Sequence, residues 1–134
     1  MQGWFWSSRP LVEIALDLRA ALELGPIHSD VENVYEWVEA PLGEAGTTIN
    51  LSRQHDPDDG DEQDRVTLLL QSDGGSLDDA AMIRIGRAIA DTLQVELHIG
   101  SIEYLQGDEY DYRAERVLRP LTGPPASRLG RRLQ

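Results

Sequence analysis

The chain of 134 residues contains no cysteine, which excludes disulfide bonds, thiolate nucleophiles and cysteine-based zinc sites. Lysine is also absent; all twelve basic residues are arginine, which we attribute to GC-rich codons. No stretch approaches the roughly 20 apolar residues of a membrane-spanning helix. The N-terminus lacks the basic and apolar segments of a signal peptide. We therefore expect a cytoplasmic bacterial protein.

Acidic residues outnumber basic ones by 24 to 12, which gives a formal net charge of −12. The acids are clustered: six fall between Asp56 and Asp64, and five more between Glu103 and Glu115. Like charges repel one another in a compact chain, so this clustering indicates either solubility or a surface for a positively charged partner. It argues against binding to nucleic acid or to anionic membranes, because both require clustered basic residues.

No catalytic or metal-binding pattern stands out in the sequence. The serines form no Gly-x-Ser-x-Gly motif, and the acidic run lacks the spacing of a calcium-binding EF-hand loop. His28, Asp30 and Glu32 would project to one side of an extended segment, but a site with a single histidine is a weak zinc candidate. We therefore predict no enzymatic activity, no cofactor and no bound metal.

Two helices are predicted from apolar residues that repeat at helical spacing. The first runs from about Pro10 to Leu24, with a preceding serine as its cap and Gly25-Pro26 as its end. The second begins at Ser76, with Asp79 three residues on as a variant of the capping box. Its buried stripe includes Gly86, which costs about 1 kcal/mol in a helix. We therefore expect this helix to approach the sheet closely.

Alternating apolar and polar residues predict the strands, which cover 34–39, 47–53, 66–71, 95–99 continued by 102–105, and about 110–118, with a short strand at 4–6. The segment 66–71 is apolar at nearly every position, which is typical of a central strand covered on both faces. Gly100 marks a bend or bulge. The tryptophans of Trp4-Phe5-Trp6 are expected to line the core.

These elements predict a two-layer α+β sandwich, in which a mostly antiparallel sheet carries both helices on one face, in the order (β)-α-β-β-β-α-β-β. Residues 1–119 form a single domain, and residues 120–134, rich in Pro, Gly, Ser and Arg, form a disordered basic tail. The sheet face away from the helices is expected to carry Tyr35, Trp37, Asn50, Ser52, Glu96 and His98.

Tyrosines interleave with carboxylates in the segment 103–112, which is typical of a surface that binds a basic protein, because rings bury area and acids steer association. A structural edge strand explains the same residues equally well. The candidate contacts in this segment are Glu103, Tyr104, Asp108, Glu109, Tyr110, Asp111 and Tyr112. A second acidic patch, which is either a contact site or a solvated linker, contains Asp58, Asp59, Asp61 and Glu62.

Three functional hypotheses follow from these observations. The first is a small acidic protein, an immunity protein or inhibitor, that neutralises a basic toxin enzyme by occluding its site. A toxin that acts on nucleic acid is cationic because its substrate is anionic, so an acidic protein reaches it quickly.

The second hypothesis is a dimeric, acidic secretion chaperone that holds an extended segment of its client. The α-β-β-β-α-β order is similar to that of such chaperones, although the N-terminal strand departs from it. The third hypothesis is a metal-binding or enzymatic domain. The first hypothesis predicts a monomer, and the second predicts a homodimer.

Overall fold

The computed structural model describes residues 1–32, 35–43, 46–54, 64–73, 77–106 and 109–121. The elements follow one another along the chain as β1 (Gln2–Trp6), α1 (Leu11–Leu22), β2 (His28–Glu32), β3 (Tyr35–Pro41), β4 (Thr47–Gln54), β5 (Arg65–Ser72), α2 (Asp79–Leu93), β6 (Leu97–Gln106) and β7 (Glu109–Leu118). The tail beyond residue 121 and most of the acidic loop lie outside the described residues.

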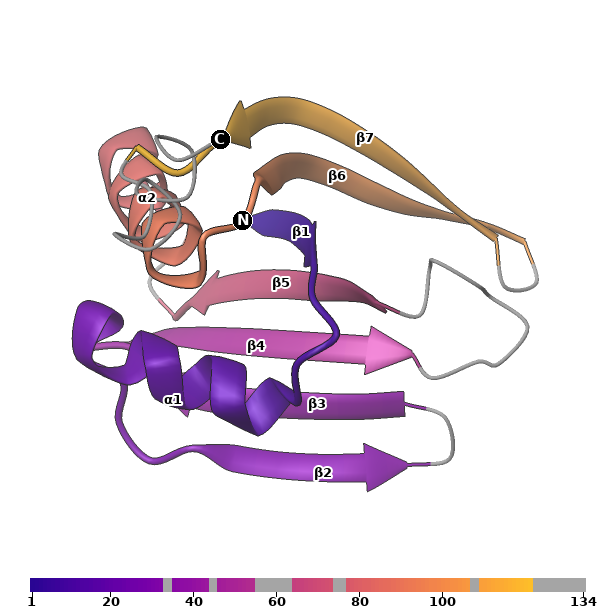
Figure 1. Ribbon diagram of the computed structural model, residues 1–134. Helices are drawn as coiled ribbons and strands as arrows, with labels where there is room; N and C mark the ends of the chain where they lie inside the picture. The colour runs from indigo at the N-terminus through magenta and orange to yellow at the C-terminus, as the bar shows by residue number, and fades with distance from the viewer. Residues whose placement is uncertain (33–34, 44–45, 55–63, 74–76, 107–108, 122–134) are drawn as a thin grey trace, which may run out of the picture.

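The described strands form one sheet in the order β2-β3-β4-β5-β1-β6-β7, with every neighbouring pair antiparallel (Figure 1). The predicted α+β class, with two helices and an antiparallel sheet, is confirmed. Strand β2 is an addition to the predicted order, because its sequence His-Ser-Asp-Val-Glu has one apolar residue and no alternation. The N-terminal strand β1 lies in the interior of the sheet, between β5 and β6.

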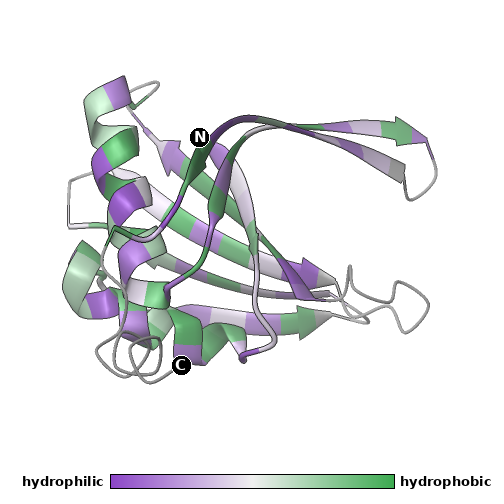
Figure 2. Cartoon of the chain, turned by 45° about the horizontal axis from the view of Figure 1, so that its top comes forward, coloured by the Kyte–Doolittle hydropathy of each residue, from purple (hydrophilic) through white to green (hydrophobic). Residues whose placement is uncertain are grey.

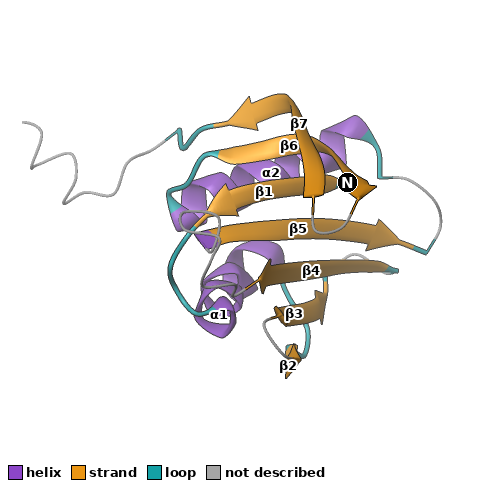
Figure 3. Cartoon of the chain, turned by 90° about the vertical axis from the view of Figure 1, so that its right-hand side faces the viewer, coloured by secondary structure: helices purple, strands orange, loops and turns teal. Residues whose placement is uncertain are grey.

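Both helices cover the same face of the sheet and also pack against each other (Figure 3). Along the strands, hydrophobic and hydrophilic residues alternate (Figure 2), so that one set faces the helices. The largest side chains that are fully buried come from both layers: Phe5, Ile14, Leu18, Leu51, Leu68, Ile89, Leu97 and Val66. The central position predicted for the segment 66–71 is confirmed, because β5 pairs with β4 and β1.

The ends of α1 differ from those predicted. Its N-cap is Pro10, and no side chain caps the first turn. Its C-terminal residue in the left-handed conformation is Glu23, with φ at 52°, rather than Gly25. Gly25 is required for another reason: a Cβ at this position would lie 2.7 Å from Cγ of Pro41. The glycine therefore allows the chain to pass close to the end of β3.

Helix α2 is capped by Asp78 rather than by Ser76, which lies outside the described residues. The Asp78 side chain accepts a hydrogen bond from the backbone N–H of Ala81 at 2.7 Å. Gly86 is buried, and a Cβ there would lie 2.7 Å from a methyl group of Leu118. The expected close approach of this helix to the sheet is thus confirmed.

Replacement of Gly86 by leucine should overpack the contact between α2 and β7. We expect Gly86→Leu to lower the free energy of unfolding by about 1–3 kcal/mol, despite the better helix propensity of leucine. Urea unfolding measures this change. Thr92→Leu, at an exposed position of the same helix, is the matched control and should be neutral or stabilising. Equal effects of the two substitutions would contradict the close approach.

Candidate functional site

The distal half of the β6–β7 hairpin extends past the rest of the sheet (Figure 1). Strand β6 pairs with β1 at two positions only, Ile99 with Gly3 and His98 with Trp4. From Gly100 onward its only strand partner among the described residues is β7. We call this part of the hairpin, residues 100–106 and 109–114, the arm.

The arm bends away from the helical layer at Gly100. The register between β6 and β7 shifts between Ile99 and Gly100, as the sequence predicted for a bend or bulge here. A Cβ at Gly100 would lie 1.9 Å from the carbonyl oxygen of Arg113, so only glycine fits between the two strands. In Figure 3 the helices lie behind the sheet, and the first part of β7 passes in front of it.

An aromatic cluster connects the arm to the open face of the sheet. The Trp4 ring stacks on His98 at a centroid distance of 5.8 Å and makes a T-shaped contact with Tyr112 at 5.2 Å. The Arg65 guanidinium lies 3.8 Å from the centroid of the Tyr112 ring and 5.7 Å from that of Trp6. We call these five residues the aromatic latch, because they join β1, β5 and β6 to a ring on the arm.

The tryptophans were expected to line the core; this prediction is wrong for Trp6, and Trp4 is buried but lies outside the main core cluster. Phe5 is fully buried beneath the helices, so alternation places Trp4 and Trp6 on the opposite face. Trp4 is nevertheless only 4% exposed, because His98 and Tyr112 pack against it. Trp6 is 42% exposed.

A row of directly opposed residues runs across the open face and ends at Trp4 of the latch. Trp37 lies opposite Ser52, Ser52 opposite Thr67, and Thr67 opposite Trp4. These residues share the face away from the helices, as the sequence indicated for Trp37, Ser52 and His98. Glu96, expected on the same face, lies just before β6 and accepts a hydrogen bond from Nε of Arg119 at 3.1 Å.

The tip of the arm exposes a pair of tyrosines. Tyr104 and Tyr110 lie directly opposite each other, with their rings in a T-shaped arrangement at 5.5 Å. They are 61% and 49% exposed, and the neighbouring Leu105 is exposed as well. Because side chains two residues apart share a side of a strand, the pair continues the side that carries Tyr112.

The carboxylates of the arm lie on its other side. Glu103 is opposite Asp111, and a like-charge cross-strand pair of this kind is unfavourable by itself. Arg113 relieves the repulsion: its Nε donates to Asp111 at 2.6 Å. This hydrogen bond, with the charges of Asp111 and Glu103, raises the pKa of Arg113. The tyrosines and these acids, predicted as one mixed surface, thus occupy opposite sides of the ribbon.

The other predicted contact residues lie either away from the tip of the arm or outside the described residues. Tyr112 is half-buried in the latch, and Glu109 begins β7. Asp108 and the four loop acids, Asp58, Asp59, Asp61 and Glu62, lie outside the described residues. The structure therefore brings Tyr104, Tyr110 and Tyr112 together and leaves the two acidic patches as sequence predictions.

A partly buried ion pair was missed in the sequence. Arg53 is only 4% exposed and donates to Glu36 at 3.0 Å and to the carbonyl oxygen of Ser7 at 2.5 Å. It shares the core side of β4 with Ile49 and Leu51, so alternation alone would have placed it there. The hydrogen bond from Arg53 to Ser7 holds the segment between β1 and α1 against the sheet. We therefore assign Arg53 a structural role.

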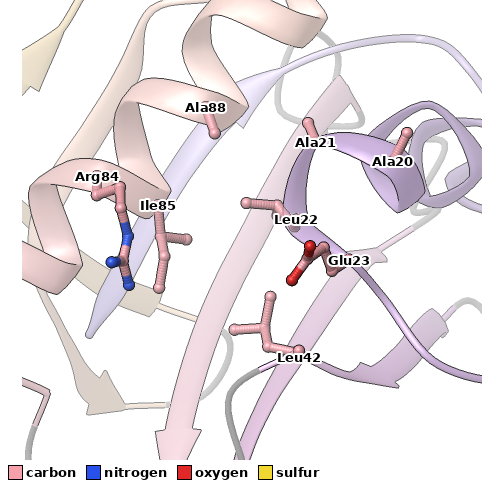
Figure 4. A pocket seen from close by; sticks show the side chains of 9 residues that line it. Ala20, Ala21, Leu22, Glu23, Leu42, Arg84, Ile85 and Ala88 are labelled. Atoms are coloured by element: carbon pink, nitrogen blue, oxygen red, sulfur yellow. The ribbon is translucent and has the colours of Figure 1, made fainter.

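A pocket of about 320 Å³ lies between the helices, remote from the arm (Figure 4). Its lining is largely small and apolar, with two charged side chains, Glu23 and Arg84. No group of three histidines or carboxylates in the described segments is arranged to hold a metal ion.

Comparisons with known proteins give no relative. No family model matches the chain, and neither a curated protein nor a solved structure is significantly similar to it. Within the described part of the chain, no helix has the length and apolar character needed to cross a membrane.

Removal of the Tyr112 ring should release the arm without unfolding the domain. We expect Tyr112→Ala to lower the free energy of unfolding by about 1–2 kcal/mol, through the lost aromatic and cation–π contacts. Amide hydrogen exchange of residues 101–104 should accelerate more than that of β4. Tyr35→Ala, which removes an exposed tyrosine distant from the arm, should change neither quantity. Unaltered exchange in the arm of Tyr112→Ala would show that the latch does not hold it.

Proposed function

We propose that this protein is an acidic protein-binding protein that neutralises a basic partner by occluding its site, in the manner of an immunity protein that blocks a toxin enzyme. The observation that carries this proposal is the arm, a projecting hairpin with an exposed tyrosine pair, in a chain of net charge −12. A projecting ribbon of two strands has a shape that fits a concave active site.

The tyrosines supply the area that binding requires. Tyrosine is enriched among the interface residues that dominate binding energy, because its ring buries much surface and orders few torsion angles. Tyr104 and Tyr110 are already in contact with each other, and the latch restrains the base of the arm. A restrained arm loses less conformational entropy on binding than a flexible loop does.

The charge supplies attraction at long range. Between residues 103 and 111 the sequence contains four acids, Glu103, Asp108, Glu109 and Asp111, and no basic residue. An enzyme that acts on nucleic acid presents a positive surface, and opposite charge accelerates association by about 10- to 1,000-fold at low salt. The arm therefore combines a steering field with a contact surface, whereas the loop acids offer charge alone.

The secretion-chaperone alternative rests on element order. Strand β1 lies inside the sheet and so separates this fold from the α-β-β-β-α-β order. Sedimentation equilibrium discriminates between the two: a stable dimer favours the chaperone, and a monomer favours the inhibitor.

Immunity proteins are encoded beside the proteins they inhibit, so the neighbouring gene supplies the first test. We expect a basic product of that gene to be toxic when expressed alone and harmless when expressed together with this chain. The two proteins should copurify as a 1:1 complex. A neighbouring product that does not bind, or that remains toxic in the bound state, would contradict the proposal.

The two acidic patches should affect different rate constants of that complex. Neutralising the loop with Asp58→Asn, Asp59→Asn, Asp61→Asn and Glu62→Gln should lower the association rate by about tenfold at low salt, with little effect at high salt. Tyr110→Ala should instead raise the dissociation rate by about tenfold or more. Stopped-flow kinetics and surface plasmon resonance measure both.

Tyr35→Ala is the control for Tyr110→Ala, since the two tyrosines are similarly exposed, at 46% and 49%. If loop neutralisation abolishes binding and Tyr110→Ala has no effect, the loop is the contact site and the assignment of the arm is wrong.

A further inference from the structure

We propose that the tyrosine side of the arm tip selects arginine over lysine in the basic partner, by stacking guanidinium groups on the Tyr104–Tyr110 pair. This inference rests on the proposed function and narrows it, because it names the residue type that the partner presents. Three observations on the arm carry it.

The first observation is an intramolecular contact of the same kind. On the side of the ribbon that carries the tip tyrosines, the Arg65 guanidinium lies 3.8 Å from the centroid of the Tyr112 ring, within stacking distance. Tyr112 is two residues from Tyr110, so the two rings lie one after the other along the same side of β7. The protein thus already uses this side of the arm to hold an arginine.

The second observation is the exposure of the tip rings. Tyr104 and Tyr110 meet in a T-shaped contact with an interplanar angle of 65°, and about half or more of each side chain is exposed. In a T-shaped pair the ring that contributes its edge keeps both faces available, and the other ring keeps one. A flat guanidinium can lie on such a face, where the ring quadrupole attracts it.

The third observation is the position of the carboxylates. Between Gly100 and Tyr104 of β6 and between Tyr110 and Ala114 of β7, the side chains on the tyrosine side include no acid: Ile102, Tyr104, Tyr110, Tyr112 and Ala114. Glu103 and Asp111 lie on the other side, and Arg113 binds Asp111. A lysine ammonium is strongly hydrated and would give up water without a carboxylate to replace it, whereas a guanidinium is weakly hydrated and stacks on rings.

The test uses two synthetic nine-residue peptides, one with arginine and one with lysine at alternate positions separated by glycine. We expect the arginine peptide to bind the full chain with a Kd about fivefold to tenfold lower than the lysine peptide, in titration calorimetry at low salt. Tyr104→Ser combined with Tyr110→Ser should remove this difference. Tyr104→Phe with Tyr110→Phe should keep it, because the ring face and not the hydroxyl makes the contact.

The outcomes separate this inference from the proposed function. If both peptides bind equally and the binding falls with salt, selection by the tyrosines is overturned while an acidic binding protein stands. If neither peptide binds at low salt, selection of arginine by the tyrosine pair is overturned, and the proposed function is decided by the neighbouring gene product alone. If the serine variant keeps the preference for arginine, the guanidinium is bound elsewhere and the tyrosine pair is excluded. Tyr35→Ser should leave both affinities unchanged, and an effect equal to that of the arm variants would also overturn the proposal.

Discussion

The pairing of β1 in the interior of the sheet is the constraint on which the rest of the structure depends. Five residues join the strands β2 to β5 on one side to the hairpin β6–β7 on the other. The strands approach closely there: a Cβ at Gly3 would lie 2.7 Å from the carbonyl oxygen of His98. Phe5 enters the core beneath the helices, and Trp4 supports the latch on the open face. One short strand thus couples the core to the arm.

The two faces of the sheet have separate roles. The helix-covered face holds the apolar core, and its buried charge is the Arg53–Glu36 pair at the connection between β1 and α1. The open face carries aromatic side chains that are packed by one another rather than by a second layer. The bend at Gly100 carries the arm to that side, which no helix covers.

Periodicity in the sequence predicted the layers but not the order of strands within the sheet. It located both helices and nearly every strand, and it marked Gly86 as a position of close approach and Gly100 as a bend or bulge. It missed β2, whose single valine gives no alternation. The role of Trp4 could not be predicted either, because its contact with Tyr112 exists only if β1 lies next to β6.

The candidate site was predicted in part. Of the tyrosines named as candidate contacts, Tyr104 and Tyr110 meet at the tip, and Tyr112 lies in the latch. The separation of the tyrosines from the acids could have been predicted from the sequence. Glu103 and Tyr104 are adjacent, as are Tyr110 and Asp111, and adjacent side chains of a strand point to opposite sides. The prediction of one surface with both tyrosines and acids was based on the composition of the segment. Composition does not show which of the two sides of a hairpin each residue occupies.

The position of β1 also determines when, during translation, the sheet can be completed. Gln2 pairs with Leu69, and Trp4 pairs with His98, so the first strand waits for partners made much later. Contacts between such distant residues slow folding, because a long stretch of chain must close before they form. A nascent chain released from the ribosome before β6 is complete has an unpaired edge on β1 and no latch. The latch can hold the arm only after β1 has paired with β6.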